Sequence, residues 1–284
     1  MTHYSFHFLF IDLPLLVSFV IMVEGCATSG TTIKYPTLPS VAVTGQHSYS
    51  RTIELDSTNQ IKKVRTMNFL FYLPESYGKH HEKKWPLILF LHGMGERGDD
   101  LELLKKHPLP KILDQQKDFP CIVVSPQLPL DKSLWDDFID PLKELLDQIQ
   151  SKYSVDTRRV YLTGLSMGGA GTWNFALRYP QYFAAIVPIA GAYKFRSKEI
   201  PDNLCDLKEL PIWTFHGGKD EAVQTWQTEI LVDALKACGS NIRYTLYPEA
   251  DHPQSWIQAY ADPELYKWLF AQTLKQPNII HITQ

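Results

Sequence analysis

The chain has 284 residues, 44% hydrophobic and 21% charged, which suits one large soluble domain or a compact α/β domain with insertions. Its formal net charge of −3 at pH 7 gives no electrostatic basis for binding nucleic acid. Its four scattered cysteines are too few for a disulfide scaffold or a zinc cluster.

An apolar stretch lies close to the start of the chain. Phe8–Val23 is too short for a comfortable membrane-spanning helix and about right for the apolar core of an export signal. It leads into Val-Glu-Gly-Cys, which resembles the lipobox whose cysteine is lipidated in bacterial lipoproteins. We therefore expect a signal segment over residues 1–26. The protein would then be a periplasmic or outer-membrane lipoprotein attached to the membrane through Cys26, or a secreted protein. A start codon placed too far upstream is the alternative.

The next segments predict a tether and then the folded domain. Residues 27–46 have little to bury and favour a flexible tether. We expect the domain over residues 47–276 and a C-terminal tail over residues 277–284. The first two strands, near Tyr49–Leu55 and Ile61–Leu73, flank a turn-like Asp-Ser-Thr-Asn-Gln and are expected to pair as an antiparallel edge.

Short apolar runs alternate with helical runs through the rest of the chain. Continuous apolar runs are typical of strands covered on both faces of a parallel sheet, and they occur at Leu87–Leu91, Cys121–Ser125, Val160–Thr163, Ala185–Ile189, Ile212–Phe215 and Ile242–Tyr247. The predicted helices are Phe138–Lys152, Gly168–Arg178, Thr225–Cys238 and Pro263–Leu274. This alternation predicts an α/β fold, with a mainly parallel central sheet and helices on both faces.

The sequence Gly-Leu-Ser-Met-Gly, residues 164–168, joins one of these strands to the helix that follows it. A serine between two such glycines at a strand-to-helix turn is typical of a nucleophile elbow, which lifts the hydroxyl above the edge of the sheet. Side chains at Gly164 and Gly168 would collide with the neighbouring strand or helix. Ser166 is therefore the candidate nucleophile, and a plain glycine turn is the alternative.

A serine hydroxyl needs a base to take its proton and an acid to orient that base. Asp220 and His252 each follow the end of a later predicted strand, where ligand sites form in open α/β sheets. We expect His252 to be the base and Asp220 to be the acid. Asp251 is expected to point elsewhere, and His216 to pack at its strand end as a structural group.

Two backbone N–H groups are expected to form an oxyanion hole. One belongs to Met167, directly after the candidate nucleophile. The other belongs to Met94 or Gly95, in the loop His-Gly-Met-Gly after the strand that ends at Leu91. Glycines allow this backbone to approach a substrate closely, and two such donors stabilise a tetrahedral oxyanion. A merely flexible loop is the alternative.

Together these stretches resemble the α/β-hydrolase superfamily. More narrowly, the chain is similar to exported bacterial esterases of the dienelactone-hydrolase, polyhydroxybutyrate-depolymerase and feruloyl-esterase type, also described as predicted peptidases or phospholipase/carboxylesterases. The matching stretches include LFLHGMGERGDD, RRVYLTGLSMGGAGTWNFALRYP, PIWTFHGGKDEAV and YPEADHPQSW. The resemblance implies an α/β-hydrolase fold with Ser166, Asp220 and His252 as a catalytic triad. It also implies a substrate pocket lined by Trp135 and Trp256, although a buried structural role is the alternative for each; we expect His92 there as well.

The leading hypothesis is serine-dependent hydrolysis of a carboxylic ester through an acyl-enzyme, with no metal or organic cofactor. The expected substrate is a small-molecule or polymer-linked ester, such as a short-chain, acetyl or feruloyl ester of a plant polysaccharide. A serine peptidase on the same fold and a non-catalytic surface-binding protein are the alternatives. Cys121 is expected in the core, while Cys205 and Cys238 are candidates for a disulfide whose geometry the sequence does not supply.

Overall fold

The structure is a computed structural model that describes residues 35–55, 63–79 and 82–274. The predicted signal segment, the lipidation at Cys26, the turn after the first strand and the C-terminal tail lie outside the described residues. Among the helices that the structure describes, none has the length and apolar character needed to cross a membrane.

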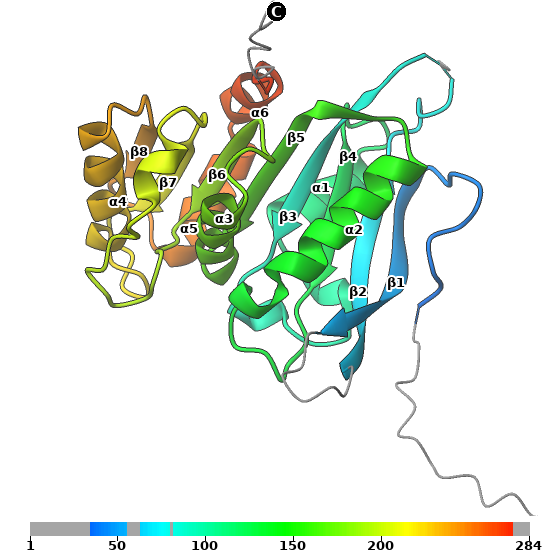
Figure 1. The fold of residues 1–284 in the computed structure, drawn as a ribbon, viewed down its shortest axis with the longest axis horizontal. Helices are drawn as coiled ribbons and strands as arrows, with labels where there is room; N and C mark the ends of the chain where they lie inside the picture. The colour runs from blue at the N-terminus through cyan, green and yellow to red at the C-terminus, as the bar shows by residue number, and fades with distance from the viewer. Residues whose placement is uncertain (1–34, 56–62, 80–81, 275–284) are drawn as a thin grey trace, which may run out of the picture. The chain divides into compact units, whose positions relative to one another are not determined.

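An eight-stranded sheet forms the centre of the described domain (Figure 1). Its order is β1-β2-β4-β3-β5-β6-β7-β8, with β1–β2 and β2–β4 antiparallel and the remaining pairs parallel. The strands are β1 (Gly45–Leu55), β2 (Lys63–Leu73), β3 (Trp85–Leu91), β4 (Ile122–Gln127), β5 (Val155–Leu165), β6 (Ala185–Ile189), β7 (Trp213–Gly217) and β8 (Arg243–Tyr247). The predicted mainly parallel sheet and its antiparallel edge are confirmed.

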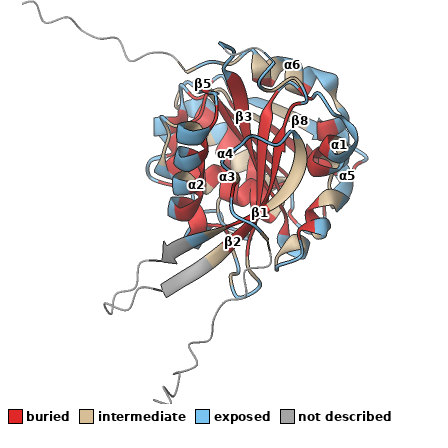
Figure 2. Cartoon of the chain, turned by 90° about the vertical axis from the view of Figure 1, so that its right-hand side faces the viewer, coloured by how far each residue is buried: buried red, intermediate tan, exposed pale blue. Residues whose placement is uncertain are grey.

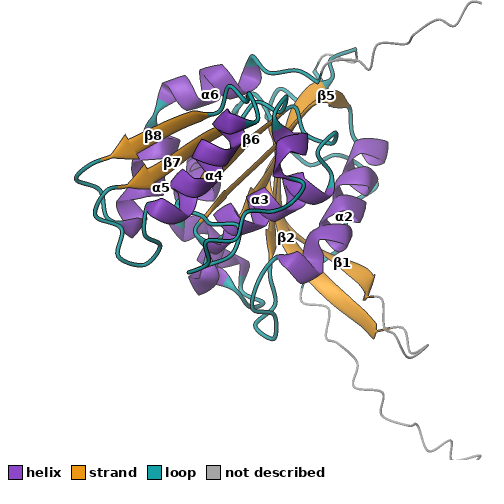
Figure 3. Cartoon of the chain, turned by 60° about the vertical axis from the view of Figure 1, so that its left-hand side comes forward, coloured by secondary structure: helices purple, strands orange, loops and turns teal. Residues whose placement is uncertain are grey.

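The central strands are buried along their length, because helices cover both faces of the sheet (Figures 2 and 3). Side chains of α2, α3 and α4 join one core cluster and those of α1, α5 and α6 join the other. The helices are α1 (Pro108–Gln115), α2 (Ile139–Lys152), α3 (Met167–Arg178), α4 (Trp226–Ala237), α5 (His252–Ala261) and α6 (Pro263–Phe270). Short 3-10 helices occur at η1 (Met94–Glu96), η2 (Leu101–Lys106), η3 (Asp136–Phe138) and η4 (Leu204–Leu207).

Helix α5, whose first residue is the candidate base His252, was not predicted from the sequence. Asp251 is the N-cap: its side chain accepts from the Gln254 N–H, and the Gln254 side chain accepts from the Asp251 N–H. Pro253 occupies the first turn, where its missing N–H costs no hydrogen bond. His252 therefore lies on a capped helix rather than in a loop.

Part of the predicted tether packs against the domain. Leu38 is only 9% exposed and joins the core cluster beneath α2. The Ser50 N–H donates to the carbonyl of Pro36 at 2.7 Å, and the Lys152 ammonium donates to the Leu38 carbonyl at 2.9 Å. Within the predicted tether over residues 27–46, Pro36 and Leu38 therefore contact the domain, whereas Val41 and Val43 are exposed.

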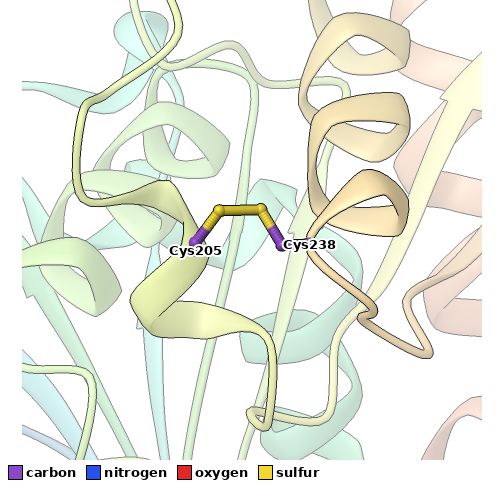
Figure 4. Close-up of a disulfide and its surroundings, with 2 residues drawn as sticks. All are labelled: Cys205 and Cys238. Atoms are coloured by element: carbon purple, nitrogen blue, oxygen red, sulfur yellow. A yellow bond between two sulfur atoms is a disulfide. The ribbon is translucent and has the colours of Figure 1, made fainter.

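Cys205 of η4 and Cys238, which follows α4, form a disulfide with their Cα atoms 5.5 Å apart (Figure 4). The bond joins the long connection between β6 and β7 to the end of α4. The third described cysteine, Cys121, is free and fully buried, as expected of a small core residue.

Candidate active site

Ser166 lies between the end of β5 and the start of α3, with φ 52° and ψ −117°. A positive φ is unfavourable for an L-residue with a Cβ and persists only where the surrounding structure fixes it. Here the Ser166 N–H donates to the Ile189 carbonyl at 2.9 Å, and the Ser166 carbonyl accepts the Ala170 N–H at 3.0 Å. The turn thus has the strained backbone of the predicted elbow.

The glycines on either side of Ser166 are required by close backbone contacts. A Cβ at Gly168 would lie 2.0 Å from the carbonyl oxygen of Leu91, at the end of the neighbouring β3. A Cβ at Gly164 would lie 2.3 Å from the carbonyl oxygen of Gly168. Either contact would force backbone to move, so the predicted reason for both glycines is confirmed.

Ser166, His252 and Asp220 form a hydrogen-bonded chain. The Ser166 Oγ lies 2.8 Å from His252 Nε2, and His252 Nδ1 lies 2.5 Å from Asp220 Oδ2. Since an ionised carboxylate only accepts, Nδ1 carries the hydrogen and Nε2 is free to accept from the serine hydroxyl. The three residues follow β5, β8 and β7, so the sheet brings together residues that are far apart in the sequence.

The side chain of Asp220 is fully buried, yet its carboxylate is held in the charged form. Burial raises the pKa of this carboxyl, but hydrogen bonds from His216, His252 and the Val223 backbone outweigh burial and hold the pKa well below its usual range. The other oxygen, Oδ1, accepts the N–H groups of Val223 and Ala222 at 2.8 and 3.0 Å.

His216, on β7, is a contact of Asp220 that the sequence analysis missed. Its Nε2 lies 3.2 Å from Asp220 Oδ2 and 2.7 Å from the carbonyl of Val223. Its Nδ1 lies 2.9 Å from Thr228 Oγ1. The spacing of four residues between His216 and Asp220 could have indicated this contact. The contact depends, however, on how the turn after β7 folds, which the sequence does not show.

Of the backbone predicted to form the oxyanion hole, Met167 directly follows Ser166, and Gly93, the residue before Met94, lies close to it. Met167 begins α3, and the first N–H groups of a helix have no partner within that helix. A Cβ at Gly93 would lie 3.7 Å from the Ser166 Cβ, so the loop before Met94 and Gly95 contacts the serine from the other side. The Met94 side chain is 52% exposed.

His92 and Trp135 support this loop from within instead of lining a pocket. Both are fully buried: His92 Nε2 accepts the Leu128 N–H at 2.9 Å, and Trp135 Nε1 donates to the His92 carbonyl at 3.1 Å. Burial lowers the pKa of His92 to about 4, consistent with a neutral ring that can accept this bond. Their assignment to the substrate pocket is therefore corrected, because packing and hydrogen bonds use their polar atoms.

Further bonds hold the same loop to the end of β4 and to the segment that follows it. Gln127 Nε2 donates to the carbonyls of Glu96 and Asp100, each at 2.8 Å. The Arg97 guanidinium donates to the carbonyls of Met94 at 3.1 Å and Lys132 at 2.8 Å. The backbone next to Ser166 is thus fixed in place before any substrate binds.

Trp256 lies next to the candidate base. Its ring is edge-on to His252, with centroids 4.8 Å apart, and it is 7% exposed. His107 is a second ring neighbour of Trp256, with ring centroids 6.1 Å apart, and contacts Glu96 Oε1 at 2.8 Å. Trp256 therefore limits the movement of the imidazole and contributes little exposed surface.

Among the residues that the structure describes, no group of histidine, cysteine and carboxylate side chains is arranged to hold a metal ion. The chemistry available at the site is that of the Ser166 hydroxyl, the His252 imidazole, the Asp220 carboxylate and the backbone N–H groups around them.

The fold is that of an α/β-hydrolase. The sequence profile of the phospholipase/carboxylesterase family matches residues 117–259, half of the chain, and the chain belongs to this family.

Two relatives illustrate the similarity. The bifunctional acetylxylan esterase/xylanase XynS20E of Neocallimastix patriciarum is 27% identical over 185 residues, which are 62% of this chain and 26% of that protein. The crystal structure of a thermostable esterase is 28% identical with a TM-score of 0.63, covering 80% of this chain and 63% of that one. The chain thus spans about a quarter of the first relative.

A feruloyl esterase module from Clostridium thermocellum, in complex with sinapinate, shares the fold. It is 18% identical with a TM-score of 0.57, and the match covers 84% of this chain and 91% of that one. At this level of identity the likeness shows the common fold alone.

Proposed function

We propose that this protein is a serine-dependent carboxylic ester hydrolase. The single observation that carries the proposal is the chain Asp220–His252–Ser166, with distances of 2.5 and 2.8 Å, at a strained strand-to-helix turn. Membership in the phospholipase/carboxylesterase family and the esterase relatives support the same reaction.

In the proposed mechanism, Ser166 attacks the ester carbonyl while His252 Nε2 takes the hydroxyl proton. Asp220 keeps the imidazole in the required tautomer and stabilises its charged form. The N–H of Met167 and that of Met94 or Gly95 donate to the oxyanion. His252 returns the proton to the leaving alcohol, and water then releases the acyl group from Ser166.

The proposed substrate is an acetyl or feruloyl ester carried by a plant polysaccharide, or a related short-chain ester. Support comes from the acetylxylan esterase relative. We also propose that the protein is exported, with attachment to a membrane through a lipidated Cys26 as one form. The disulfide between Cys205 and Cys238 supports export, because such bonds persist in oxidising compartments.

The test measures release of p-nitrophenol from acetate, butyrate and octanoate esters and of ferulate from methyl ferulate. We expect wild-type activity, with a loss of at least about 10³-fold in Ser166→Ala. Ser197→Ala, in the connection after β6, is the matched control and should keep full activity. Hydrolysis of peptides but not esters would instead favour a serine peptidase. A folded wild type that is inactive on esters, peptides and polysaccharide fragments would contradict an enzymatic role.

A further inference from the structure

The Asp220 carboxylate lies between two imidazoles. Its Oδ2 atom is 2.5 Å from His252 Nδ1 and 3.2 Å from His216 Nε2. His216 is fully buried, hydrogen-bonds Val223 and Thr228 and contacts Asp220, whereas the mechanism proposed above uses only His252. A buried histidine that shares an oxygen atom with the candidate base needs an explanation beyond packing.

The hydrogen-bond partners of His216 determine the role of its Nε2 atom. Its Nε2 faces the carboxylate of Asp220 and the carbonyl of Val223, both of which only accept. Nε2 must therefore carry a hydrogen and donate it. On the other side, Nδ1 lies 2.9 Å from Thr228 Oγ1, which is also 2.7 Å from the Gly191 carbonyl. Whichever of these contacts the threonine hydrogen serves, Nε2 carries one hydrogen, which the Val223 carbonyl at 2.7 Å and Asp220 Oδ2 at 3.2 Å share.

We propose that His216 is a positioning residue for Asp220, and this inference rests on the proposed function. The Nε2–H group holds Oδ2 in line with His252 Nδ1 and takes up part of the carboxylate charge. Thr228, from α4, holds the His216 ring at the required angle. The backbone N–H groups of Ala222 and Val223 fix the other carboxylate oxygen, so Asp220 cannot rotate.

The charges that surround Asp220 define the expected pH behaviour. Within the described part of the chain, its charged or titratable hydrogen-bond partners are His216 from β7 and His252 from α5. On the far side of the His216 ring, the uncharged Thr228 of α4 contacts Nδ1 and also lies against the Gly191 carbonyl, so no further charge enters there. Without the His216 donor, more of the carboxylate charge acts on His252, which should then hold its proton to higher pH.

Two substitutions at the same position separate donation from packing. In His216→Gln the amide nitrogen can occupy the place of Nε2, whereas in His216→Asn it can occupy only the place of Nδ1. We expect His216→Asn to lower kcat about 10- to 100-fold, the loss typical of one hydrogen bond to a charged group, with little change in KM. The acid limb of its kcat/KM profile should move to higher pH. His216→Gln should restore both the profile and most of the activity.

The same comparison is made without substrate by following the His252 ring proton signals by NMR across pH. A higher titration midpoint in His216→Asn, restored in His216→Gln, supports the proposal even if the wild type hydrolyses no ester. In that case only the proposed function fails. A folded His216→Asn that titrates as the wild type does would overturn the inference, as would equal losses in both variants with unchanged pH profiles. If His216→Asn does not fold, the His252 titration is measured in Thr228→Val instead. A smaller rise of the midpoint in this variant supports the inference, and an unchanged midpoint overturns it.

Discussion

Ser166 is held where its neighbours leave little choice of conformation. The Ile189 carbonyl takes its N–H, Gly164 and Gly168 allow the backbones to meet, and His252 Nε2 lies 2.8 Å from its hydroxyl. A serine in this position is already aligned with its base, so little ordering remains when a substrate arrives. The cost is a strained backbone, which the packed strand and helix maintain.

The low pKa of Asp220 links catalysis to stability. Because this pKa is lower in the folded protein than in the unfolded chain, the charged carboxylate stabilises the fold above the unfolded pKa of about 3.9. That contribution is lost as the pH falls through the folded pKa. We therefore expect Asp220→Asn to unfold at lower urea concentration than the wild type at pH 7, with the difference shrinking below about pH 4. Its kcat should fall about 10³- to 10⁴-fold.

Urea unfolding at pH 7 and at pH 3 measures this difference. Asp233→Asn, on the exposed face of α4, is the matched control and should change stability by less than about 0.5 kcal/mol at both pH values. An Asp220→Asn deficit that is equal at the two pH values would contradict a role for the carboxylate charge.

The residues that sequence patterns identify best are those tied to a strand end. Ser166, Asp220 and His252 each follow the end of a predicted strand, so their meeting at one edge of the sheet could be predicted. The contact of His216 with Asp220 could not, because it depends on the turn between them. His92 was misplaced for a similar reason: the sequence shows a polar ring in a glycine-rich loop, but not that the Leu128 N–H turns toward it.

At the level of elements, α5 is the clearest addition to the sequence prediction. The pattern Ala-Asp-His-Pro-Gln suggests a loop, since proline is unfavourable inside a helix. The same residues suit a helix start, with Asp251 as cap and Pro253 in the first turn. Because the cap fixes where the helix begins, it also fixes the backbone of His252, and the ring then needs only side-chain packing from Trp256.

The disulfide between η4 and the end of α4 is expected to be a major contribution to stability. Cross-linking residues 33 apart removes chain entropy from the unfolded state, worth about 3–4 kcal/mol in the loop-entropy model. The double variant Cys205→Ser/Cys238→Ser should therefore melt about 10 °C below the wild type. Scanning calorimetry with and without reductant checks this: reductant should lower the melting temperature of the wild type and leave that of the double variant unchanged. A wild type insensitive to reductant would contradict the expectation.

At the scale of the whole molecule, strand–helix alternation predicted the order and type of the central elements. The apolar runs were long enough to mark each strand, although β5 extends beyond its predicted run at both ends. Helix α1 escaped prediction because two prolines interrupt its short pattern. The burial of Leu38 was not predicted either, because a single apolar residue in a mostly polar segment does not reveal whether it is buried.

A substitution at Leu38 tests whether the folded domain includes this residue. Its side chain is almost fully buried, so Leu38→Ala should lower the free energy of unfolding by about 2–3 kcal/mol. Val41→Ala is the matched control on the same segment, since Val41 is 74% exposed and its truncation should cost less than about 0.5 kcal/mol. Chemical denaturation measures the loss in free energy of unfolding for each variant. Equal losses in the two variants would show that Leu38 does not stabilise the domain.

The distance along the chain between nucleophile and base has a consequence for biosynthesis. His252 follows Ser166 by 86 residues, and Asp220 is made between them. At about 5–20 residues per second, a ribosome needs on the order of ten seconds to pass from the serine codon to the histidine codon. Throughout that interval the nascent chain carries a serine with no partner to activate it. The proposed activity therefore switches on only after the last parallel strand and α5 have emerged and docked, and a chain interrupted before that point would be harmless to the esters of the cell that makes it.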